Sequence, residues 1–112
     1  MKKLLVPVSV AMAFFTVLLS LSYAATPARI LTGRVLGRQD QPLAKAVVYL
    51  KNTKTLTVKT YISDLDGSYR FSQLSPDVDY EVYAEYNAAR SDTKTLSAFD
   101  DRKQVNITLR IK

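Results

Sequence analysis

Apolar and polar residues alternate with a period of two along most of this chain after residue 29. The clearest case is the segment 79–86, in which Tyr, Val, Ala and Tyr occupy the even positions from 80 and Glu, Tyr and Glu lie between them. Successive side chains of a β-strand point to opposite faces, so this pattern predicts strands with one buried face. The segment 25–112 shows no convincing helical period, and the sequence therefore predicts an all-β fold.

Turn-forming residues divide the alternating part of the chain into short segments. The strongest turn signal is Asp64-Leu65-Asp66-Gly67, because Asp side chains bond to nearby backbone and Gly accepts a positive φ. Short strands that recur about every 8–12 residues are typical of a Greek-key β-sandwich. The sequence predicts a sandwich with seven strands, at residues 30–36, 44–51, 56–63, 68–72, 79–86, 93–98 and 104–112.

The first 24 residues have the pattern of a signal peptide. Lys2 and Lys3 precede the uncharged, mostly apolar run 4–21, and Ser22-Tyr23-Ala24 places small residues at a cleavage site. We expect an N-terminal hydrophobic signal helix at residues 1–24, cleavage before Ala25, and a secreted or periplasmic domain at residues 25–112. The alternative is a retained membrane anchor, because the run approaches the ~20 residues that span a bilayer.

Composition excludes several classes of function. Without Lys2 and Lys3 the chain has 14 basic and 10 acidic residues, spread singly, so no nucleic-acid-binding tail is predicted. The chain contains no His and no Cys, which removes the usual proton shuttle and the soft metal ligands. Glu81 and Glu85 would lie ~13 Å apart on a strand, beyond the 5–9.5 Å of glycosidase pairs. We expect no enzyme activity and no cofactor.

Four local patterns occur in a recognisable order. They are Thr32-Gly33-Arg34-Val35, the segments 42–50 and 63–71, and Tyr80-Glu81-Val82. Together they resemble the carboxypeptidase regulatory-like domain, which implies a prealbumin-like (transthyretin-like) β-sandwich. Two positions depart from the family pattern: Lys45 replaces a usual Gly and Ser63 a usual Thr. Lys45 would adopt either an ordinary negative φ or a slightly strained conformation.

Three tyrosines are the candidate binding residues. Tyr49, Tyr61 and Tyr83 fall on the polar face of the second, third and fifth predicted strands, because Leu56, Val58, Thr60 and Ile62 form the alternating set of the third. In a prealbumin-like order these strands are neighbours, so the tyrosines would form an exposed aromatic strip, which is common in binding surfaces. The other interpretation is ordinary cross-strand pairing.

These observations favour an exported, non-enzymatic accessory module that acts through protein–protein contacts at the cell envelope. One alternative is a carbohydrate-binding module that uses the tyrosine strip. Another is an oligomeric carrier of a small hydrophobic ligand. The partner, an envelope protein or a glycan, is not specified by the sequence, and membrane contact is expected only if residues 1–24 are retained.

Three further motifs favour ordinary structure over a site. The Asp64–Gly67 turn resembles the start of a calcium loop, but Gln73 occupies the position of the bidentate Glu, which leaves calcium dependence open. A Lys–Asn isopeptide bond lacks a Lys on the first strand. The sequon at Asn106 lies inside a predicted strand, where glycosylation is disfavoured.

Overall fold

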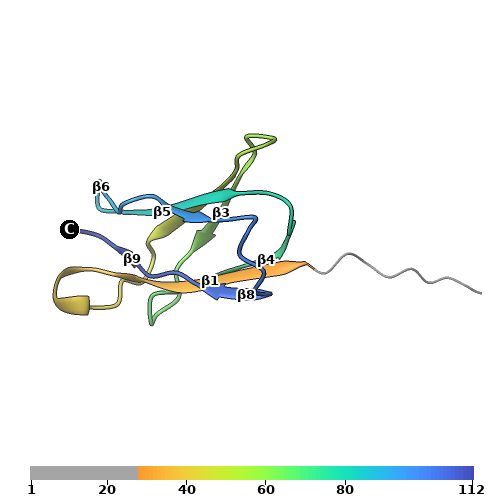
Figure 1. Cartoon of the computed structure of the whole chain (residues 1–112). Helices are drawn as coiled ribbons and strands as arrows, with labels where there is room; N and C mark the ends of the chain where they lie inside the picture. Colours follow the sequence, from red (N-terminus) through yellow and green to blue (C-terminus); the bar gives the residue numbers. More distant parts are fainter. Residues whose placement is uncertain (1–27) are drawn as a thin grey trace, which may run out of the picture.

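The computed structural model describes residues 28–112, which form two facing β-sheets (Figure 1). The first sheet has the order β4 (Ser68–Leu74), β1 (Arg29–Leu36) and β8 (Gln104–Asn106), and β9 (Leu109–Arg110) continues beside β1. The second has the order β3 (Val58–Ile62), β2 (Val47–Asn52) and β5 (Tyr80–Tyr86), with β6 (Ala89–Arg90) and β7 (Lys94–Leu96) along the far side of β5. The all-β prediction and the expected neighbours of the second sheet are confirmed.

The predicted count of seven strands is wrong, because the described residues contain nine strands and a short 3-10 helix, η3 (Arg38–Asp40). The last predicted strand divides into β8 and β9, which both run parallel to β1. It is interrupted at Ile107, whose carbonyl oxygen turns toward the core and accepts a hydrogen bond from the Tyr69 hydroxyl at 2.6 Å. The other addition, β6, lies between the predicted strands 79–86 and 93–98.

The core fills the space between the two sheets. The alternation placed Leu31 and Val35 together, and both are fully buried. In the last predicted strand, alternation places Val105, Ile107, Leu109 and Ile111 inward. Three of these are buried, and Ile107 packs partly buried against the core. The buried cluster consists of Leu31, Val35, Ala46, Val48, Leu50, Tyr69, Phe71, Leu74, Val78, Tyr80, Val82, Ala84, Leu96, Val105, Leu109 and Ile111.

The Ser63 side chain fixes the start of β2 through two hydrogen bonds. The buried Ser63 hydroxyl donates to the carbonyl of Leu43 at 2.6 Å and accepts from the N–H of Ala46 at 2.8 Å. This bridge explains why a hydroxyl residue suits this position. Lys45 has a φ of 65°, in the left-handed region that favours glycine, so the strained alternative applies to the departure from the family pattern.

The predicted signal peptide and its helix lie outside the described residues. None of the helical turns within residues 28–112 is long and apolar enough to cross a membrane.

Candidate binding surface

Two of the three predicted tyrosines meet on the outer face of the second sheet. Tyr49 on β2 is directly opposite Tyr83 on β5, and both are partly exposed. Their ring centroids are 4.9 Å apart with an interplanar angle of 19°, so the rings are stacked. The pair arises because alternation directs both residues outward and the β2–β5 register aligns them.

The Arg90–Glu85 ion pair lies beside this stack. Arg90 on β6 lies with its guanidinium carbon 4.4 Å from the centroid of the Tyr83 ring. Its Nε and Nη2 donate to one oxygen of Glu85, at 3.2 and 2.8 Å. Because β2 and β6 flank β5 on opposite sides, Tyr49 and Arg90 cover opposite faces of the Tyr83 ring.

The charges of this cluster are coupled. The hydrogen bond from Arg90 lowers the pKa of Glu85, and the same bond raises the pKa of Arg90. The nearby Glu85 carboxylate raises the pKa of Tyr49. Glu85 accepts hydrogen bonds from Arg90 and affects the ionisation of Tyr49, and we refer to Tyr49, Tyr83, Glu85 and Arg90 as the tyrosine–arginine cluster.

The prediction that Tyr61 shares the outer face is wrong. Tyr61 is paired with the buried Val48, which places it on the core side of β3. There its ring meets Phe71 edge to face, with centroids 6.0 Å apart. The physical cause is the β2–β3 hairpin: Leu56, with a φ of 65°, belongs to the turn rather than to the strand, and the register that results directs Tyr61 inward.

The outer face of β3 consequently carries apolar side chains. Val58 and Ile62 are 53% and 56% exposed, and Thr60 lies between them opposite Tyr49. With Lys51 and Glu81 paired nearby, the face combines apolar, aromatic and charged groups.

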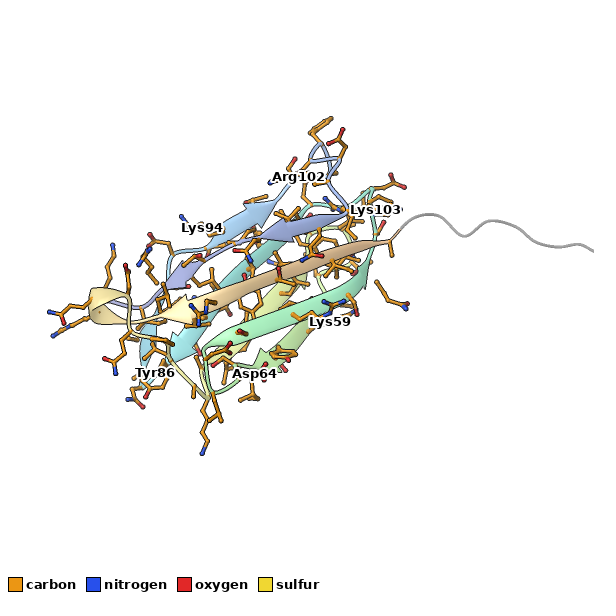
Figure 2. All side chains as sticks on the ribbon, turned by 90° about the horizontal axis from the view of Figure 1, so that it is seen from below. Lys59, Asp64, Tyr86, Lys94, Arg102 and Lys103 are labelled. Carbon is orange, nitrogen blue, oxygen red and sulfur yellow. The ribbon has the colours of Figure 1, made fainter. Side chains whose placement is uncertain are left out.

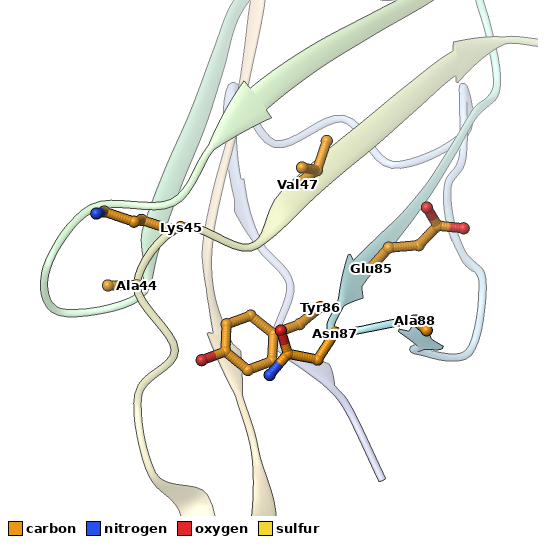
Figure 3. A pocket seen from close by; sticks show the side chains of 7 residues that line it. All are labelled: Ala44, Lys45, Val47, Glu85, Tyr86, Asn87 and Ala88. Atoms are coloured by element: carbon orange, nitrogen blue, oxygen red, sulfur yellow. The ribbon is translucent and has the colours of Figure 1, made fainter.

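A shallow pocket adjoins the cluster at the start of β2 (Figure 3). It has a volume of about 410 Å³. In Figure 3, Tyr86 and Asn87 lie beside each other, whereas the carboxylate of Glu85 points away from them. The lining residues are Ala44, Lys45, Val47, Glu85, Tyr86, Asn87 and Ala88.

The Asp64–Gly67 segment forms a closed turn. Gly67 has a φ of 81°, and its N–H donates to the Asp64 carbonyl at 2.9 Å. Asp66 accepts from the N–H of Ser68 at 3.1 Å, and the hydrogen bonds from Ser68 lower its pKa. Within residues 28–112 no three acidic, His or Cys side chains are grouped as metal ligands would be.

Sequence reasoning missed Arg90 as a partner of Tyr83. Alternation already placed Glu85 on the face of Tyr83, but Arg90 reaches that face only because Asn87 and Ala88 adopt positive φ values of 48° and 66° and return the chain as β6. Non-glycine residues rarely take this conformation, so the sequence carries little signal for the turn.

Residues 30–110 match the family model of the carboxypeptidase regulatory-like domain. No curated protein matches the chain.

Solved structures resemble the fold at low sequence identity. A variant of the major pilin subunit of Bacillus cereus has a TM-score of 0.59 and 14% identity, over 74% of this chain and 29% of the pilin. The dioxygenase domain of a dioxygenase–carbohydrate-binding fusion from a cellulolytic Streptomyces has a TM-score of 0.55 and 15% identity, over 81% and 83%. Catechol 1,2-dioxygenase from Pseudomonas arvilla has a TM-score of 0.58 and 13% identity, over 80% and 53%. At these identities the likeness is one of fold alone, and this chain spans under a third of the pilin.

Proposed function

Because this chain belongs to the family of carboxypeptidase regulatory-like domains, we propose that it is an exported, non-enzymatic module that binds another protein at the cell envelope. The observation that carries the proposal is the tyrosine–arginine cluster on the outer face of the second sheet. Export rests on the signal-peptide pattern of residues 1–24.

The ring packing of the cluster supports a protein partner over a sugar. A sugar ring stacks on an open aromatic face, but Tyr49 and Arg90 already cover the two faces of Tyr83. Tyr83 therefore offers no open face, and the exposed Val58 and Ile62 lie on the same side of the sheet. Tyrosine and arginine dominate the energetically important positions of protein interfaces, and tyrosine contributes contact area at a low entropic cost.

The absence of enzyme activity is part of the same proposal. The chain has no His or Cys to act as base or nucleophile. On β5, the carboxylate of Glu85 is engaged by Arg90, and Glu81 is paired in register with Lys51. We therefore assign these two carboxylates to the binding surface and give them no catalytic role.

A capture experiment with matched variants tests the proposal. The full chain, tagged after Lys112, is used to recover proteins from the envelope of its host, and each captured protein is then purified and titrated. We expect a partner that the double variant Tyr49→Ala/Tyr83→Ala binds at least tenfold more weakly. The control Arg34→Ala/Arg70→Ala removes two exposed side chains from the outer face of the first sheet and should bind normally.

Two outcomes would contradict the proposal. In one, both double variants bind the recovered partner as the wild type does, which would show that the partner does not contact the second sheet through the two tyrosines. In the other, a glycan array shows binding that is lost with Tyr49→Ala, which would favour the carbohydrate-binding alternative.

A further inference from the structure

The strand β3 has one side without a neighbour in the described part of the chain, because it ends the order of the second sheet. The N–H of Asn52 donates to the Thr57 carbonyl at 2.9 Å, and the N–H of Ser63 donates to the Ala46 carbonyl at 2.8 Å. Bonded and non-bonded pairs alternate in an antiparallel ladder. Lys59 and Tyr61 therefore bond to β2, while the N–H and C=O groups of Val58, Thr60 and Ile62 point away from the sheet.

The other described edges are interrupted or very short. β4 contains an irregularity opposite Arg29 to Leu31, where Gln73 has a φ of 59°, and such a bulge disrupts pairing. The remaining edge strands, β6 to β9, are two or three residues long. β3 has five residues, no proline and a continuous register. Lys59 is its one protective charge. Since proteins usually blunt such edges by short length, bulges, proline or charge, β3 is the least protected of the described edges.

The side chains beside this edge are apolar on the outer face. Val58 and Ile62 are each more than half exposed. Lys59 is the strand's charged residue, and Figure 2 shows it on the flank of the molecule opposite Lys94. A paired strand would cover the apolar residues and satisfy the open backbone groups together.

We propose that β3 pairs with β3 of a second copy of this chain, antiparallel and about a two-fold axis at Thr60. The three open positions are symmetric about Thr60, so Thr60 meets Thr60 and Val58 meets Ile62 of the second copy. This register is self-complementary: each open N–H finds a carbonyl, and each exposed apolar side chain finds another. A two-fold contact of this kind closes on itself, because both copies use the same surface.

The pairing would join the two outer faces. Tyr83, Tyr49 and Thr60 already lie in one row across the sheet. The row would continue through Thr60 of the second copy to its own two tyrosines, with the Tyr49 residues ~14 Å apart at three strand spacings. The paired protein would thus present two copies of the tyrosine–arginine cluster on one continuous surface. The proposal does not depend on that cluster binding a partner.

The pairing is expected to be weak and to depend on salt. A five-residue contact falls below the ~1,000 Å² of most stable interfaces. Lys59 would lie opposite Tyr61 of the second copy and diagonally, at ~7–8 Å, from its Lys59. Because like charges at this separation repel, raising the salt concentration should strengthen the pairing.

Sedimentation equilibrium of the exported protein, purified from the periplasmic or secreted fraction, from about 10 μM to about 1 mM tests the proposal, since weak contacts fall in this range of dissociation constants. We expect a dimer fraction that rises with concentration and with salt. Val58→Lys or Ile62→Glu alone should weaken the dimer about tenfold, while the double variant should restore it, because each new lysine lies opposite a new glutamate. Within one copy the two positions are ~13 Å apart and form no pair.

A backbone variant provides a second readout. Thr60→Pro removes an N–H that points away from β2, so the β2–β3 ladder remains intact and circular dichroism should be unchanged. We expect this variant to stay monomeric, while Thr60→Val dimerises like the wild type. A wild type that is monomeric throughout, a Thr60→Pro variant that still dimerises, or a charge pair that fails to restore the dimer would each overturn the proposal.

Discussion

The hydroxyl of Tyr69 donates a hydrogen bond to the carbonyl oxygen of Ile107, 2.6 Å away, and the bond passes over the backbone of Gly33. Three strands, β4, β1 and the interrupted last strand, therefore meet at one point. Tyr69 is 2% exposed, and burial raises the pKa of its phenol. A side chain at position 33 would occupy the space that this contact needs.

Gly33→Ala should therefore destabilise the domain strongly. The added Cβ would lie 1.8 Å from the Ile107 carbonyl oxygen and 2.7 Å from the Tyr69 ring. Overpacking and the weakened hydrogen bond together should cost about 3 kcal/mol of the free energy of unfolding. Urea denaturation measures this change in the free energy of unfolding. The control, Gly37→Ala, meets only the flexible end of Leu43 at 3.2 Å and should change stability by less than about 1 kcal/mol.

Arg29 is a buried cation whose partners are backbone carbonyls. It is 3% exposed, and its guanidinium donates to Ser97 at 2.7 Å, Val78 at 2.8 Å and Ser75 at 3.0 Å. These carbonyls belong to the β4–β5 and β7–β8 loops, so one side chain ties the start of β1 to both. Its Nε has no hydrogen-bond partner among the described residues.

Arg29→Met should destabilise the domain by about 2–4 kcal/mol, because four backbone carbonyls, that of Asp100 at 3.4 Å included, lose a charged donor. The measurement is urea denaturation, with hydrogen exchange of the two loops. Arg34→Met, at an exposed position of the same strand, is the matched control and should stay within about 0.5 kcal/mol of the wild type. Equal stability of the two variants would refute the structural role of Arg29.

Alternation predicted the strands well where one set of residues is clearly more apolar than the other. On β5 the buried set is Tyr80, Val82 and Ala84, and the predicted bounds differ from the structure by one residue. On β3 both sets contain large apolar or aromatic residues, so alternation alone does not determine which face is buried. There the hairpin register decides, and it depends on Leu56 taking a positive φ that a leucine rarely adopts.

The contacts that build the candidate surface were only half predictable. Tyr49, Tyr83 and Glu85 follow from alternation and strand order. Arg90 requires the two-residue turn at Asn87 and Ala88. The Tyr69–Ile107 bond is of the same kind, since it depends on packing between residues 38 positions apart. Local patterns predict which face a residue occupies, whereas contacts between distant segments require the assembled fold.

Asp100 should make stability depend on pH in the acid range. A hydrogen bond from Arg102 lowers the pKa of Asp100 from 3.8 to about 2. A carboxylate with a lowered pKa in the folded state adds stability above its unfolded pKa and loses it as the pH falls. Asp100→Asn should thus lower the melting temperature at pH 5–7, and the difference from wild type should vanish between about pH 4 and pH 2.

The matched control for this prediction is Asp101→Asn, which removes an equal charge at the exposed neighbouring position. Melting temperatures of all three proteins are compared from pH 7 to pH 2. A difference between Asp100→Asn and wild type that persists unchanged at pH 2 would show that the Asp100–Arg102 pair does not cause it.

Export predicts a defined mature terminus. Cleavage after Ser22-Tyr23-Ala24 should leave a chain that begins at Ala25, which intact mass spectrometry of the periplasmic or secreted fraction would identify. Ala24→Leu should block processing, because signal peptidase requires a small residue there. Recovery of the whole 112-residue chain from the membrane fraction would instead support the retained anchor.

The Glu85 carboxylate should control the ionisation of Tyr49. The interaction with this carboxylate is the main cause that raises the pKa of Tyr49 above the ordinary value of 10.0. Glu85→Gln removes the negative charge that disfavours the tyrosinate, so the pKa of Tyr49 should fall back toward 10.0. NMR titration of the protein with ring-labelled tyrosine measures the pKa of Tyr49. Glu81→Gln, on the same face but opposite Lys51, should leave the Tyr49 titration unchanged; equal shifts in both variants would exclude a specific Tyr49–Glu85 contact.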